Sequence, residues 1–245
     1  SMSWSAMAPL PASGRQYCST FFIENKGYLF GGVDASGPLN ELWEFDLATE
    51  QWAQRASLPG PGRSATVAFE SGPFAFICTG MLSGGIPTNE VWRYDPFNDV
   101  WDQRASFPGA PRHRATGFGS YPWVIGGADQ SFQALADGWS YDSNNDEWKT
   151  LPDLPSPRYG AAGTAYFGPM LFCGASGAEF HDEVFGVDLS VSMDWTNSFG
   201  NCAGGGRKGA VAGQGWANAL GWTFCGLGSD ASFRYKDWYG AGMPV

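Results

Sequence analysis

Arginines are the residues whose spacing in this sequence first suggests chemistry. Five of them recur at nearly regular intervals, and an arginine stays charged and bonds carboxylates or phosphates through a planar, bidentate fork. If the fold brought them to one place, they would form an anion-binding site in a chain whose formal net charge is −10. The five are Arg15, Arg63, Arg112, Arg158 and Arg207.

Each of these arginines follows a tryptophan in the same register, which reveals an internal repeat of about 48 residues. Every copy contains a run of small residues, an apolar run that ends in glycine, and an aromatic alternation that mostly ends in Asp. Alternation with period two predicts strands, and Asp followed by Asn, Thr or Ser predicts tight turns. The tryptophans that follow these turns are Trp4, Trp52, Trp101, Trp148 and Trp195.

The segment 28–63 carries the repeat in its clearest form, with a Gly pair, an aromatic-x-aromatic-Asp strand, a Trp and a Leu-Pro-x-x-x-Arg tail. These features resemble kelch repeats, and the resemblance covers essentially the whole chain. It implies a β-propeller with one four-stranded blade per repeat around a central channel. We therefore expect an all-β, five-bladed kelch-type propeller that forms a single domain over residues 3–245. The expected blades are approximately 15–55, 63–104, 112–151, 158–197, and 207–237 together with 3–8.

The two ends of the chain predict how the propeller closes. After the last aromatic run, at 233–236, nine residues remain, too few for another turn, strand and exit. Trp4 lacks preceding strands but stands 11 residues before Arg15, the spacing seen in the next copy. The N-terminal strand is therefore expected to complete the last blade. Residues 1–2 are interpreted as a remnant of recombinant expression.

In such a propeller each repeat arginine precedes the innermost strand, so the five would surround one mouth of the channel. In some kelch proteins, arginines at this repeat position help bind acidic peptide segments, and the resemblance implies such a site here. A second interpretation stays open, in which each arginine bonds a carbonyl or carboxylate of a neighbouring blade, because buried arginines are usually paired.

The residues beside the arginines differ between copies, and specificity on a repetitive scaffold resides where the copies differ. In the third copy, the order Arg-His-Arg leaves open which of the two arginines faces the channel. The candidate ligand-binding residues are therefore the five repeat arginines together with Arg114, Tyr17, His113, Tyr159 and Lys208.

Composition restricts the partners of this chain. Lys and Arg total only 14, which argues against a nucleic-acid partner. No apolar run approaches the roughly 20 residues that a membrane span needs, so we expect a soluble chain. Five cysteines without a CxxC spacing do not define a compartment, and an extracellular or periplasmic part of a larger protein is one option. We expect a monomer that binds an acidic protein segment or a small anionic ligand.

The sequence assigns no catalytic or metal-binding residue. Its two histidines, His113 and His181, lie in different loops, and no G-x-S-x-G motif is present. We therefore expect a non-enzymatic interaction module without a cofactor. Two alternatives remain: a carbohydrate-active or metal-dependent enzyme that uses the loops at the channel mouth, and a structural propeller domain of a larger surface or secreted protein.

Overall fold

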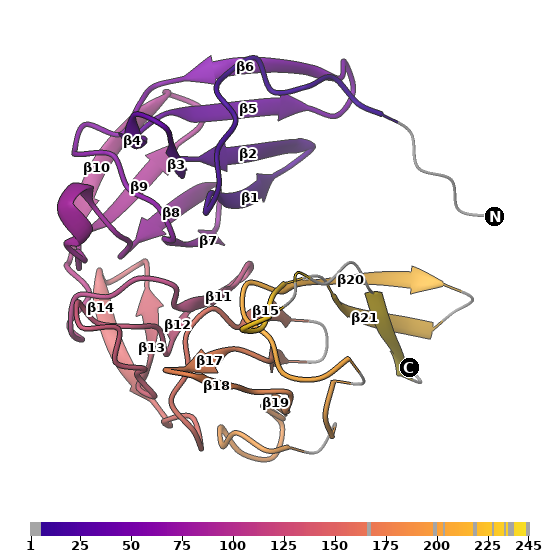
Figure 1. Cartoon of the computed structure of the whole chain (residues 1–245). Helices are drawn as coiled ribbons and strands as arrows, with labels where there is room; N and C mark the ends of the chain where they lie inside the picture. Colours follow the sequence, from indigo (N-terminus) through magenta and orange to yellow (C-terminus); the bar gives the residue numbers. More distant parts are fainter. Residues whose placement is uncertain are drawn as a thin grey trace.

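The computed structural model describes residues 6–165, 168–197, 200–202, 204–217, 220–226, 228–232, 234 and 238–243. Antiparallel sheets follow one another in chain order around a centre, which is the architecture of a β-propeller (Figure 1). The first strands of successive sheets lie next to one another, in the order β1, β7, β11, β15 and β20. Within the described ranges, no helix is long and apolar enough to cross a membrane.

Three sheets have four strands each, and their strands follow the expected order from the inner to the outer edge. The short apolar runs and aromatic alternations form the second and third strands, and the Trp of each copy lies on the fourth. The first blade contains β1 (Ser19–Ile23), β2 (Lys26–Phe30), β5 (Leu42–Asp46) and β6 (Gln51–Arg55). The second contains β7 (Val67–Ser71), β8 (Phe74–Cys78), β9 (Val91–Asp95) and β10 (Val100–Arg104). The third contains β11 (Thr116–Phe118), β12 (Tyr121–Ile125), β13 (Gly138–Asp142) and β14 (Glu147–Leu151).

The fourth blade has the same order but a reduced outer edge. It contains β15 (Ala162–Ala165), β16 (Pro169–Phe172) and β19 (Val184–Gly186), and two isolated bridges, Gly186–Thr196 and Glu183–Asn201, stand where the fourth strand runs in the other blades. Two short hairpins connect the second and third strands of the first and fourth blades. They are β3 (Val33–Asp34) with β4 (Gly37–Pro38), and β17 (Ala175–Ser176) with β18 (Glu179–Phe180).

The last sheet departs from the repeat. It pairs β20 (Val211–Ala217), β21 (Leu220–Gly226) and β22 (Trp238–Met243), so its third strand comes after the aromatic run at 233–236. Of that run only Arg234 is described, and it forms an isolated bridge with Ser229. The structure therefore shows four blades of the repeat type, and the prediction of five is wrong. The reason is the long β20–β21 hairpin, whose second seven-residue strand, β21, pairs with β22 instead.

The predicted closure by the N-terminal strand is likewise absent from the described residues, where no N-terminal segment pairs with β20, β21 or β22. Residues 1–5, which include half of the expected strand at 3–8, lie outside the described residues. The chain from Ala8 onward does follow the repeat. The Trp52 indole donates a hydrogen bond to the Ala8 carbonyl at 2.9 Å, as Trp101 donates to Ala56 at 2.7 Å. The repeat tryptophans thus fasten each blade to the segment that links it to the preceding copy.

The core lies between successive blades, where aromatic rings stacked within one sheet meet the edges of rings from the next sheet. Phe21 and Tyr28 of the first blade stack with ring centroids 4.8 Å apart, and the edge of Tyr94 from the second blade approaches Tyr28 at 6.0 Å. Phe69 and Phe76 stack at 5.2 Å in the same way, against Tyr141 of the third blade. This packing fixes the inner strands, and with them the loops at the channel mouth.

A cationic cavity at the channel mouth

The repeat arginines are buried in the structure. Arg63 is fully buried, the Arg15 side chain is 3% exposed, and the other three are each 1% exposed. A buried charge is tolerated only where a partner compensates it. Four of the arginines form an ion pair with a carboxylate of their own repeat, located just before the aromatic strand. The pairs are Arg15–Glu41 at 2.7 Å, Arg63–Glu90 at 2.6 Å, Arg112–Asp137 at 2.7 Å and Arg158–Glu183 at 3.4 Å.

In the third copy, the guanidinium of the repeat arginine donates several hydrogen bonds within its own blade. Arg112 donates to both carboxylate oxygens of Asp137, at 2.8 and 2.7 Å, and to the Gly126 carbonyl at 2.9 Å. The Trp139 indole donates to the same carboxylate at 2.8 Å. Burial alone would raise the pKa of Asp137, but the hydrogen bonds from Arg112 and Trp139 lower it overall. Arg15, Arg63, Arg112 and Arg158 thus already have a counter-charge within the scaffold, so we do not place the anion site on them.

The residues two positions after the repeat arginines, in contrast, lie beside one another at the channel mouth. A chain of backbone hydrogen bonds joins them: Ala65 N to Tyr17 O at 2.8 Å, Arg114 N to Ala65 O at 3.0 Å, Gly160 N to Arg114 O at 2.9 Å, and Gly209 N to Gly160 O at 2.8 Å. All five have φ between 53° and 65°, a left-handed conformation uncommon for residues other than glycine. Three of the five are Ala or Gly, so space remains between them.

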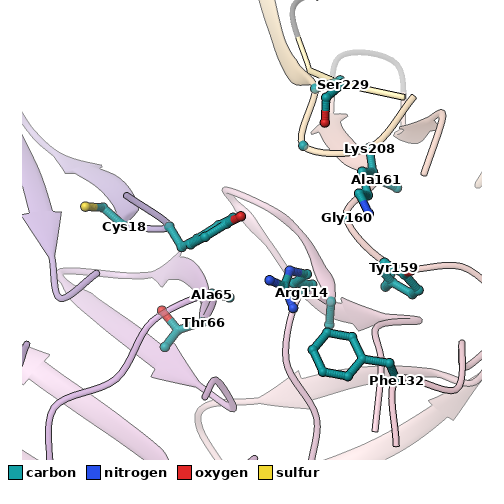
Figure 2. Close-up of a pocket in the computed structure, with 14 residues that line it drawn as sticks. Cys18, Ala65, Thr66, Arg114, Phe132, Tyr159, Gly160, Ala161, Lys208 and Ser229 are labelled. Carbon is teal, nitrogen blue, oxygen red and sulfur yellow. The ribbon is translucent and has the colours of Figure 1, made fainter. Parts of the chain in front are cut away.

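That space is a cavity of about 310 Å³, which we call the mouth cavity. Figure 2 shows Arg114 between a wall that carries Cys18 and Thr66 and a wall that carries Phe132 and Tyr159, with Lys208 and Ser229 on a further side. Ten of its fourteen lining residues come from the second and third positions after the five repeat arginines. The lining consists of Tyr17, Cys18, Ala65, Thr66, Arg114, Ala115, Phe132, Tyr159, Gly160, Ala161, Lys208, Gly209, Ala210 and Ser229.

The lining contains two cations and no carboxylate. Among the described residues, neither Arg114 nor Lys208 belongs to an ion pair closer than 4.0 Å, the limit for the pairs given above. Aromatic rings support both side chains: the Arg114 guanidinium lies 5.0 Å from the Tyr17 ring and 5.3 Å from the Phe132 ring, and the Lys208 ammonium lies 5.9 Å from the Tyr159 ring. Rings hold a cation in place without neutralising its charge. The mouth cavity is therefore positively charged.

His113 lies behind Arg114, fully buried. Burial, together with the positive charge of Arg114, lowers the pKa of His113 to about 4. The imidazole is therefore neutral near pH 7, and its Nδ1, 2.9 Å from Arg114 Nη1, accepts a hydrogen bond from the guanidinium. A neutral His113 thus helps to orient Arg114 without competing for an anion.

The structure separates the predicted site residues into two groups. Arg114, Tyr17, Tyr159 and Lys208 line the mouth cavity, with His113 behind them, whereas the repeat arginines lie in the scaffold. The Arg-His-Arg ambiguity of the third copy is resolved, because Arg112 is the scaffold residue and Arg114 lines the cavity. Cys18, Thr66, Phe132 and Ser229 were not predicted. The first two could have been found by following the third position after each arginine, but Phe132 belongs to a loop with no repeat pattern.

The two histidines, which an enzymatic interpretation would need, form contacts with neighbouring side chains instead. His181, in the fourth blade, has its Nε2 2.9 Å from the Ser176 hydroxyl and its Nδ1 3.6 Å from Glu183, and burial and the Arg158 charge lower its pKa. His113 contacts Arg114 and Phe132 instead. Across the described part of the chain, no three His, Cys, Asp or Glu side chains gather in a way that could hold a metal ion.

Comparison with known proteins places the architecture. A family model described as the kelch motif matches residues 14–59. The chain is 25% identical over 212 residues to the Kelch-like protein terF of Aspergillus terreus, covering 80% of this chain and 36% of that protein. It thus spans little more than a third of that relative's length. A solved structure entitled "Structure of YjhT" superposes with a TM-score of 0.80 at 17% identity, covering 99% of this chain and 85% of that one. At this identity the likeness demonstrates the fold alone.

Proposed function

We propose, from the premise that this chain belongs to the kelch-repeat family, that it is a non-enzymatic binding module which recognises an anionic ligand in the mouth cavity. The observation that carries the proposal is the pair of cations, Arg114 and Lys208, in a cavity without carboxylates. It is the more telling because the chain has a net charge of −10 and four of its repeat arginines are already paired with carboxylates. An uncompensated positive site on an acidic protein attracts anions selectively.

The geometry of Arg114 favours a carboxylate or a similar planar anion. Tyr17 and Phe132 lie against the guanidinium, and His113 takes one of its N–H groups. The remaining N–H groups lie along the edge of the guanidinium plane, where a carboxylate binds in the bidentate mode. Lys208 adds a compact charge that can contact a second oxygen.

The size of the cavity restricts what enters it. A volume of about 310 Å³ accommodates an acidic side chain or a small molecule and lies at the lower end of the range for ligand pockets. Tyr17 is 49% exposed at its rim and is available to contact the groups that flank a bound anion. The proposed ligand is therefore an acidic protein segment that inserts one carboxylate, or a small anionic molecule.

The experiment measures binding of a short Glu-rich peptide, of its Gln counterpart and of small carboxylates by isothermal titration calorimetry. We expect the Glu peptide or a carboxylate to bind, and Arg114→Ala and Lys208→Ala each to weaken that binding about tenfold or more, the range for a charged contact. Raising the salt concentration should weaken it further. Lys149→Ala is the matched control, because Lys149 is 64% exposed on the outer strand of the third blade, and it should leave the affinity unchanged.

Two results would overturn the proposal. One is equal binding of the Glu and Gln peptides together with no binding of small carboxylates. The other is an unchanged affinity in the Arg114→Ala, Lys208→Ala double variant.

A further inference from the structure

Two thiols lie close together in the fourth copy. Cys173 directly follows β16 and is fully buried, whereas Cys202 is partly exposed in the segment that leads to Arg207. Their Sγ atoms are 3.2 Å apart. A disulfide bond is about 2 Å long, so an approach of roughly 1 Å would bring the sulfur atoms to bonding distance.

The surroundings hold the two cysteines in this position. The Cys202 amide donates to the Asp182 carbonyl at 2.6 Å, and the Asn201 side chain donates to the Asp182 carboxylate at 3.1 Å. On the other side, Arg158 Nη1 donates to the Cys173 carbonyl at 2.9 Å. This bond holds the backbone of Cys173 in place, and Cys202, the partly exposed member of the pair, is the thiol that a dissolved disulfide can reach.

From this geometry we infer that Cys173 and Cys202 are a site of reversible oxidation, at which a low-molecular-weight disulfide converts the two thiols into an intrachain disulfide. The Cys202 thiolate attacks the reagent, forms a mixed disulfide and releases one thiolate. Cys173 then loses its proton, attacks the Cys202 sulfur and displaces the second thiolate. Two protein thiols are oxidised, one reagent disulfide is reduced to two thiols, and no other oxidant is needed.

The bond would fasten the segment before Arg207 to the fourth blade. Gly174, the neighbour of Cys173, already donates its amide to the Arg207 carbonyl at 2.7 Å, and Lys208 follows directly. A cross-link between residues 29 positions apart also restricts the unfolded chain. The oxidised protein should therefore melt at a higher temperature than the reduced protein. This inference does not depend on the proposed ligand.

The test incubates the full chain with oxidised glutathione, blocks remaining thiols by alkylation and maps the peptides by mass spectrometry without reduction. We expect a cross-linked pair of peptides containing Cys173 and Cys202, no retained glutathione, and reversal by dithiothreitol. Cys18→Ser should keep the cross-link, and Cys202→Ser should lose it. Cys202→Ser should melt like the reduced wild type, which separates loss of the bond from loss of the fold.

The inference is overturned if glutathione remains attached to Cys202 while Cys173 is alkylated. It is also overturned if Cys202 is found cross-linked to another cysteine of the chain.

Discussion

Arg112 and Arg114 stand two residues apart, and the protein uses them in opposite ways. Arg112 is 1% exposed and donates to both oxygens of Asp137. Arg114 adopts a left-handed backbone conformation that turns it into the mouth cavity, where aromatic rings rather than carboxylates surround it. The comparison shows that residue type alone does not mark a binding residue. What matters is whether the fold has already supplied a counter-charge.

The same contrast extends to the other copies. At the first position the residue is always arginine, and four copies provide a carboxylate to pair with it, which is what a scaffold requires. Two residues later the five copies have four different residue types, while the backbone conformation stays the same. A constant backbone with changing side chains gives the cavity its shape and its charge. That second position comprises Tyr17, Ala65, Arg114, Gly160 and Gly209.

The largest expected effect is the loss of stability when Arg112, the scaffold arginine of the two, is replaced. Arg112→Ala leaves the Asp137 carboxylate with the Trp139 indole as its remaining side-chain donor and removes the guanidinium from the Gly126 carbonyl, and removing one partner of a buried ion pair typically costs about 3–5 kcal/mol. Asp137 is partly exposed, so we expect about 3 kcal/mol, measured as a lower free energy of unfolding in urea. Arg114→Ala should lower the same quantity by less, about 1–2 kcal/mol, since it breaks two stacking contacts and one hydrogen bond but no ion pair. Equal losses for the two variants would contradict the division into scaffold and site.

The next effect is the pH dependence of folding stability that His113, between the two arginines, causes. Because the folded pKa of His113 is about 4 and its ordinary value is 6.5, the unfolded chain binds more protons between these values. This contribution to stability is fully present above pH 6.5 and is lost as the pH falls toward 4. The full contribution of His113 to the free energy of unfolding is about 3 kcal/mol.

Urea unfolding of the wild type and of His113→Gln between pH 7 and pH 5 measures this effect. Gln is the matched replacement because Gln16 occupies the equivalent position of the first copy. The variant should lose the share of the pH dependence that His113 contributes, whereas His181, whose pKa is also lowered, keeps its own share in this window. The contribution of carboxylates with lowered pKa values, such as Asp137, disappears only at lower pH. Parallel curves for the two proteins would show that His113 is not held neutral.

The sequence predicted the scaffold well because the repeat marks the packing residues themselves. The tryptophans, the glycine-ending runs and the aromatic alternations are local patterns, and three blades follow them strand by strand. The prediction failed in the last copy, where the aromatic run resembles the others and yet β22 takes its place. Strand pairing there depends on the length of the β20–β21 hairpin, which no local pattern encodes.

The site was harder to predict because pairing between distant residues decides it. The partners Arg63 and Glu90 are 27 residues apart, and Arg112 and Asp137 are 25 apart. Both members are visible in the sequence, but only the packing of a blade brings them together. The sequence therefore could not show that a carboxylate neutralises Arg15, Arg63, Arg112 and Arg158, and that among the described residues Arg114 has no such partner.

The smallest expected effect tests whether the ring beside Arg114 contributes to binding. Tyr17→Ala removes a stacking partner 5.0 Å from the guanidinium, an interaction worth about 0.5–1 kcal/mol at an exposed site. Ala65 shows that alanine adopts the same left-handed conformation in the second copy, so the backbone should tolerate the change. We therefore expect a few-fold weaker affinity for the anionic ligand, measured by calorimetry, with the free energy of unfolding changed by less than about 0.5 kcal/mol. Tyr17→Phe keeps the ring and should retain the wild-type affinity. If Tyr17→Phe weakens binding as much as Tyr17→Ala does, the hydroxyl contacts the ligand directly and Arg114 is positioned by Phe132 and His113 alone.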